Sequence, residues 1–210
     1  MSFFCNFQSD KCPGSINGNP INGLCEKVCV EAKKVFDACM QQSQLTNIIL
    51  PITNLTPSNP TYPLTFISAK STVSKGVISN LLIEPLAERP HASRVKADIT
   101  IPVSVAYTDF NGVEGVATSS ITVTKDVILN TPNASIMPYD VEALVSLVST
   151  QGSYTGENQF TIDACVSIVL KIVMEVELLI PSYGYACIPP CQEYTQEVCA
   201  GFFELPMYPE

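Results

Sequence analysis

Cysteine is the residue of this sequence whose number and placement point most directly to chemistry. The 210 residues include nine cysteines, which fall into two groups. The first group is Cys5, Cys12, Cys25, Cys29 and Cys39, and the second is Cys165, Cys187, Cys191 and Cys199. Residues 40–164 between the groups carry no thiol. Because the number is odd, pairing within one chain leaves at least one thiol over, which predicts a link between chains or a free thiol.

The spacing of the cysteines favours disulfide cross-links over a zinc site. Three residues separate Cys25 from Cys29, and three separate Cys187 from Cys191. Zinc knuckles usually have two residues between their cysteines, often with histidine as a further ligand, and the sequence has no such pair. We therefore predict that all nine cysteines are disulfide or cross-linking positions. The alternative is a cytoplasmic zinc-binding module whose four cysteine ligands come from both ends of the chain.

Few other residues are placed for catalysis. His91 is the single histidine and lies in a predicted turn after Pro90, so any nucleophile–histidine pair would have to use it. Glu175 and Glu177 fall on one side of a predicted strand, where paired carboxylates on an acidic surface are usually solvated. The sequence has no glycine-rich phosphate loop and no short catalytic motif. We expect no enzymatic activity, no catalytic residue, and no bound cofactor or metal.

The charge balance excludes one large class of partners. The net charge is −9 and the sequence pI is about 4.6, with only 11 lysines and arginines. Binding to nucleic acid requires clustered basic side chains that neutralise phosphates, so we expect no nucleic-acid partner. Charged residues make up 15% of the chain, below the roughly 25% of an average soluble domain. A surface with so few charges is typical of a protein that packs against copies of itself.

The elements that would position these cysteines are mainly strands. The longest apolar run lies in 160–191 and alternates at period two, which predicts a half-buried strand. Its predicted buried face is Ile168, Leu170, Ile172, Met174, Val176, Leu178 and Ile180. Lys171, Glu175 and Glu177 interrupt the run, so we expect no membrane span.

The middle of the chain has a similar β pattern. Alternating residues in 68–129 predict several strands, with a tight turn at 109–112, where the sequence is Asp-Phe-Asn-Gly. Pro102 inside one of these strands predicts a sheet edge or a bulge. Residues 140–149 fit either a strand or a helix. Several strands with tight turns and little helix predict a mainly β, β-sandwich-like domain.

One segment departs from this pattern. Residues 22–42 predict an amphipathic helix whose apolar face is Cys25, Cys29, Ala32, Phe36, Cys39 and Met40. We therefore divide the chain into a cysteine-rich arm and helix at 1–44, an all-β core domain at 45–183, and a Pro/Tyr/Cys-rich tail at 184–210. The start of the sequence has neither a basic segment nor a continuous apolar segment, so we expect no secretory signal peptide. Synthesis in a cytoplasm follows, although disulfides are rare there.

Four stretches between Ile99 and Cys191 form a further pattern. They are the Tyr107 strand and its turn, 123–129, 162–165, and 179–185 leading to Pro189, Pro190 and Cys191. With these stretches, the segment resembles the SPOCS-type domain of clostridial spore coat and exosporium proteins. The resemblance implies a structural protein that assembles with copies of itself, and with other spore-surface proteins, into a cross-linked lattice or appendage. It also implies synthesis in the mother cell without a signal peptide and oxidation at the spore surface. The family has no catalytic residues to carry over.

Overall fold

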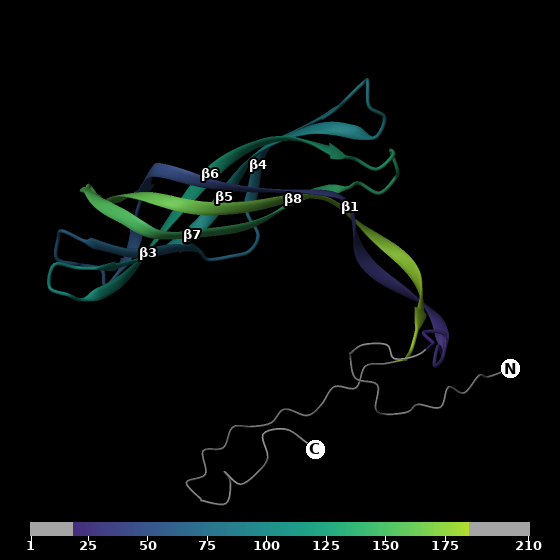
Figure 1. Ribbon diagram of the computed structural model, residues 1–210, viewed down its shortest axis with the longest axis horizontal. Helices are drawn as coiled ribbons and strands as arrows, with labels where there is room; N and C mark the ends of the chain where they lie inside the picture. The colour runs from purple at the N-terminus through teal and green to yellow at the C-terminus, as the bar shows by residue number, and fades with distance from the viewer. Residues whose placement is uncertain (1–18, 185–210) are drawn as a thin grey trace, which may run out of the picture. The chain divides into compact units, whose positions relative to one another are not determined.

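The computed structural model describes residues 19–184, in which the chain is mainly β. Eight strands form one hydrogen-bonded sheet (Figure 1). They are β1 (Glu26–Pro51), β2 (Thr53–Thr56), β3 (Thr65–Ser71), β4 (Val77–Pro85), β5 (Ala92–Thr108), β6 (Glu114–Asn130), β7 (Asp140–Gly156) and β8 (Gln159–Ser182). Residues 31–178 form one compact unit, called the body below, and the described part of the other unit is 19–30 with 179–184. The predicted mainly β class is confirmed.

The sheet has the strand order β1-β8-β7-β3-β5-β6-β2, and β4 also pairs with β5. Its centre is the long antiparallel hairpin of β5 and β6, whose register runs without a break from Ala92↔Asn130 to Thr108↔Glu114. The predicted turn closes this hairpin. There the carboxylate of Asp109 accepts the backbone N–H groups of Asn111 and Val113 at 2.9 and 2.8 Å.

The hydrophobic core of the body lies between strands that are distant in the sheet order. Figure 1 shows β7 and β8, in green, crossing over β5 and β6, in teal. One cluster of buried residues draws on all four of these strands. Its fully buried members include Ile99, Ile101, Tyr107, Leu129, Leu147, Phe160, Ile162, Ile168, Leu170 and Ile172. The alternation along β5 and β8 thus places every second side chain in this core.

The predicted buried face of β8 is confirmed over its first half. Ile168, Leu170 and Ile172 are 0–2% exposed. Beyond that point the pattern changes, because Val173 is also buried while Leu178 and Ile180 are 40% and 39% exposed. The apolar sequence therefore continues past the part of the strand that faces the core.

The predicted N-terminal helix at 22–42 is wrong, because residues 26–42 lie in the extended strand β1. The backbone N–H of Cys25 donates to the carbonyl of Ser182 at 2.9 Å, and β1 is hydrogen-bonded to β8. The described residues contain no helix at all. The apolar residues that recur at helical spacing belong to a strand with both exposed and half-buried side chains. Its partner strand, β8, is more than a hundred residues away in the sequence.

The structure also tests two further expectations, one for residues 140–149 and one for Pro102. Residues 140–149 are in strand β7, which settles the choice between strand and helix. Pro102 lies inside the central strand β5, where β5 exchanges one neighbour for another. β4 pairs with β5 up to Thr100, β3 pairs from Val103, and the N–H of Thr72 donates to the Pro102 carbonyl at 3.0 Å. The missing N–H of proline therefore points into the break between β3 and β4.

Within residues 19–184, no helix is long and apolar enough to cross a membrane.

Candidate cross-linking cysteines

The structure describes four of the nine predicted cross-linking positions. Cys25 is joined in a disulfide, and Cys29, Cys39 and Cys165 are free thiols. The remaining predicted positions lie outside the described residues: Cys5, Cys12, Cys187, Cys191 and Cys199. The predicted role of all nine cysteines stays a prediction.

Cys165 lies on the outward face of β8, and its thiol is exposed. Its two neighbours in the strand, Ala164 and Val166, point into the core and are 1–2% exposed. Directly opposite on β7 is Val148, which is 52% exposed. This exposed valine gives the thiol an apolar neighbour while leaving it open to solvent.

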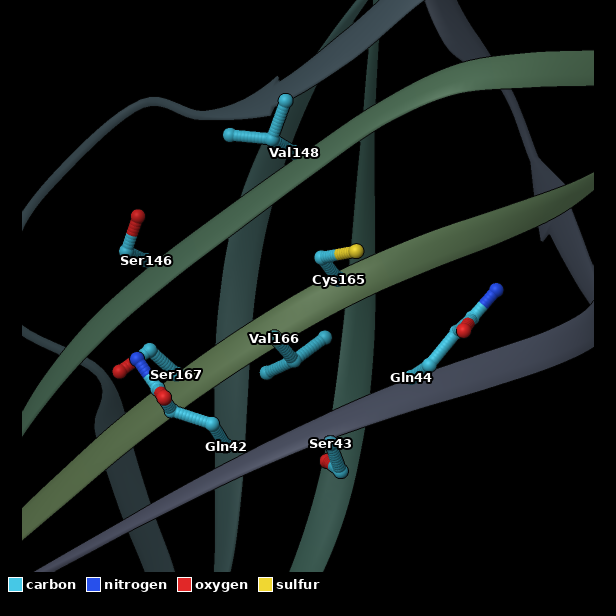
Figure 2. Close-up of a pocket in the computed structure, with 8 residues that line it drawn as sticks. All are labelled: Gln42, Ser43, Gln44, Ser146, Val148, Cys165, Val166 and Ser167. Carbon is cyan, nitrogen blue, oxygen red and sulfur yellow. The ribbon is translucent and has the colours of Figure 1, made fainter.

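An open hollow of about 480 Å³ surrounds Cys165. Figure 2 shows the cysteine on the middle strand, between Val148 of β7 and Gln44 of β1. The other lining residues are Gln42, Ser43, Ser146, Val166 and Ser167, which contribute hydroxyl and amide groups beside apolar surface. None of these groups is charged, so a second polypeptide can approach the thiol without displacing an ion pair. Sequence reasoning missed this lining because it ended a helix at residue 42, where the structure continues strand β1.

Cys39 is the least accessible of the three free thiols. It lies on β1, is half-buried and packs against the hydrophobic core. Desolvation raises the pKa of the Cys39 thiol, and a hydrogen bond with the Leu170 backbone offsets part of that rise. Because the thiolate is the reactive form, Cys39 reacts less readily than an exposed cysteine.

Cys29 belongs to the described part of the smaller unit, 19–30 with 179–184, and its thiol is exposed. It lies between Val28 and Val30, both half-buried, as expected for alternate residues of a strand. The predicted place of Cys29 on the apolar face of a helix is therefore wrong. Among the described residues, Cys29 and Cys165 are the two free thiols that a second chain could reach.

An ion-pair cluster connects β1 to β7 within the body. The carboxylate of Glu142 on β7 lies 2.6 Å from the Lys33 ammonium of β1 and 3.3 Å from that of Lys75. The hydrogen bond from Lys33 is the main cause of the lowered pKa of Glu142. Lys33 and Lys75 remain partly exposed, so the cluster orients β1 more than it stabilises the fold.

The other candidate residues do not assemble into a catalytic or metal site within residues 19–184. His91 is exposed in a turn with φ of 69°, and in the described part no side chain is hydrogen-bonded to it. Glu175 and Glu177 are exposed on β8, and Glu175 lies 3.9 Å from Lys33. In the same range, no three cysteine, histidine or acidic side chains are placed to hold a metal ion.

Comparison with known proteins gives no relatives: no protein-family model, curated protein or solved structure matches this chain.

Proposed function

We propose that this chain is a structural subunit that assembles with copies of itself into a disulfide cross-linked layer or appendage. The observation that carries the proposal is the exposed, free thiol of Cys165 on the outward face of strand β8. No cysteine partner for it lies among residues 19–184. Disulfide formation requires Cα atoms within about 7 Å of each other, so a thiol held on a strand needs a partner brought to it by another segment or another molecule.

The sequence pattern supports the same proposal. Two cysteine-rich ends flank a body whose interior is apolar and whose own strands contain only Cys39 and Cys165. A body that does not depend on disulfides for its core can use its thiols as connectors. The low charge content is consistent with close packing between copies.

We place this subunit at the spore surface, in the coat or exosporium, on the resemblance to SPOCS-type proteins. On the same ground, its partners are copies of itself and other spore-surface proteins, and it is made in the mother cell. We further propose that the sheet, folded over its own core, is a sandwich-like body. The proposed location is tested separately from the cross-linking, by locating the protein in sporulating cells.

The test is a denaturing gel of air-exposed full-length protein, run with and without thiol reductant. We expect multimers that collapse to a band near 22.8 kDa only with reductant. The double variant C29S/C165S should shift the distribution toward shorter species, because it removes the two exposed free thiols found among the described residues. The matched control is C39S, which removes a half-buried thiol and should leave the ladder unchanged.

A single monomer band in both lanes would overturn the proposal. If the cysteines then become alkylatable only after treatment with a chelator, the zinc-binding alternative is correct instead. If multimers form but persist undiminished in C29S/C165S, the connectors are other cysteines and the role of Cys165 is wrong.

A further inference from the structure

Strand β4 has one unpaired edge. It pairs with β5 along one side, and within residues 19–184 no strand pairs with its other side. Just before β4 begins, Lys75 forms an isolated bridge with Leu144 of β7, and the Gly76 N–H donates to the Ala143 carbonyl at 3.0 Å. In the described chain β7 forms no further bridge with β4, so the outer edge is open from Val77 onward.

The other edge strands of the sheet are protected against pairing with another chain. β1 has lysines in its first half and side-chain hydrogen bonds to β6 in its second half. β2 is only four residues long. Charged side chains, lysine above all, and short length are common protections of an open edge. β4 has nine residues, and its only charged residue is Glu84 near its end.

A bulge in β4 is followed by two outward leucines. The register with β5 shifts once within the strand, and Asn80 has φ of 50° there. The Asn80 side-chain amide donates to the Asp98 carboxylate at 2.7 Å, which holds the bulge in place. Leu81 and Leu82 are 44% and 48% exposed, and Val77 before the bulge is 61% exposed. The strand therefore presents apolar side chains beside an unpaired backbone edge.

We propose that the open edge of β4 pairs with the same edge of a second copy, antiparallel and about a two-fold axis near Asn80. The inference rests on the proposed function and names the surface at which two copies first meet. Val77 and Leu82 lie on one face of β4, because their β5 partners Thr100 and Lys96 both lie on its outward face. Antiparallel pairing then places Val77 of one copy beside Leu82 of the other.

The charges at the two ends of β4 are complementary in this arrangement. Lys75 lies just before the strand and Glu84 near its end, and their side chains are 66% and 51% exposed. Each has an ion-pair partner in its own chain, Glu142 and Arg94 respectively, but keeps free surface. An antiparallel partner brings Lys75 of one copy near Glu84 of the other at both ends of the interface. A parallel partner would bring like charges together, so charge favours the antiparallel pair.

The two-fold arrangement also limits the size of this assembly. An isologous contact uses the same surface on both copies, so it closes at the dimer and cannot extend into a layer by itself. The proposed disulfides would then join such dimers into larger particles. Pairing at β4 is non-covalent, so unlike those links it should persist in reductant.

Analytical ultracentrifugation of the full chain in reductant tests the proposed surface. We expect a concentration-dependent dimer. Leu82→Lys should weaken it by about tenfold or more, because apolar contact is lost and a charge is introduced at two symmetric positions. The matched control is Val116→Lys on β6, since Val116 has the same exposed fraction of 48% and lies away from β4. This control should leave the dimer unchanged.

Mixing charge variants tests the orientation of the pair. K75E and E84K should each weaken the dimer, because each creates a like-charge contact at both ends of the interface. An equimolar mixture of the two variants should restore it, since both contacts in the mixed dimer then join a glutamate and a lysine. Recovery in the mixture also shows that both variants are folded.

The proposal is wrong if the wild-type chain is monomeric in reductant at every concentration, or if L82K dimerises as tightly as the wild type. It is also wrong if V116K weakens the dimer as much as L82K does, or if the mixture of K75E and E84K stays monomeric. A monomer in reductant that still gives multimers on the non-reducing gel would refute pairing at β4 and leave the disulfide proposal standing. A reductant-resistant dimer without those multimers would do the reverse.

Discussion

At the scale of single residues, burial separates thiols that are chemically identical in the sequence. Cys165 and Cys39 both lie in the body, yet Cys165 is exposed beside an open hollow and Cys39 packs against the core. Lys125 shows the same effect on an amine, because desolvation lowers its pKa just as it raises that of Cys39. Burial favours the neutral form in both cases. Position in the sheet, and not spacing along the chain, therefore ranks these groups by reactivity.

We predict that Cys39 is alkylated more slowly than Cys165 and Cys29 in the native chain, by roughly tenfold or more. Its raised pKa means that less thiolate is present at neutral pH, so its rate should continue to rise into the alkaline range above the ordinary cysteine pKa. The measurement is peptide mass spectrometry after timed treatment with iodoacetamide at several pH values. In denaturant the difference between Cys39 and Cys165 should vanish. Equal native rates would show that Cys39 is not shielded by the core.

At the scale of elements, the sequence predicted the features that depend on residues close together in the chain. The turn at Asp109 to Gly112 was predicted because asparagine and glycine suit it, and Gly112 has φ of 81° there. The alternation of β8 identified its buried face as far as Ile172. Both features depend on residues adjacent in sequence. The body's mainly β class could therefore be predicted without knowing which strands pair.

The error at β1 has the opposite origin. Cys25, Cys29 and Phe36 recur at helical spacing, but the segment is extended because β8 provides its hydrogen-bond partners. Tertiary pairing commonly overrides local preference in this way. The contact of Gln41 with Lys125, and the hollow around Cys165, depend on the same pairing. Neither could be predicted from the sequence, because each brings together strands that are far apart in the chain.

The β5–β6 hairpin gives an element-scale prediction at Gly115. This residue is directly opposite Tyr107, which is fully buried, and a Cβ at position 115 would lie 2.6 Å from the tyrosine Oη. Because such crowding in a packed core forces displacement, we expect Gly115→Ala to lower the free energy of unfolding by about 1–3 kcal/mol. Urea denaturation followed by circular dichroism would measure it.

A rescue variant separates this crowding from a general effect on the strand. Tyr107→Leu removes the ring atoms nearest to the new methyl group, so G115A should cost less in the Y107L background than in the wild type. The two changes are in contact, so non-additive effects are expected. Additive costs would show that the ring of Tyr107 is not what excludes a side chain at position 115.

At the scale of the whole molecule, the hydrophobic core and the cysteines proposed to link chains are separate parts of the structure. The buried cluster of the body is built from aliphatic and aromatic side chains. The two cysteines of the body, Cys39 and Cys165, are free thiols. Hydrophobic burial of this kind does not depend on redox potential. Assembly through disulfides would depend on it completely.

We therefore predict that reductant dissolves multimers of the full chain without unfolding the body. Thermal unfolding followed by circular dichroism should give the same cooperative transition with and without reductant, because no disulfide within residues 31–178 contributes to it. Light scattering on the same samples should report large particles only in the oxidised state. A body that loses its cooperative transition on reduction would show that disulfides hold the fold together, and a loss on chelation would show that a metal does. Retention of large particles in reductant would mean that non-covalent contacts alone maintain the assembly.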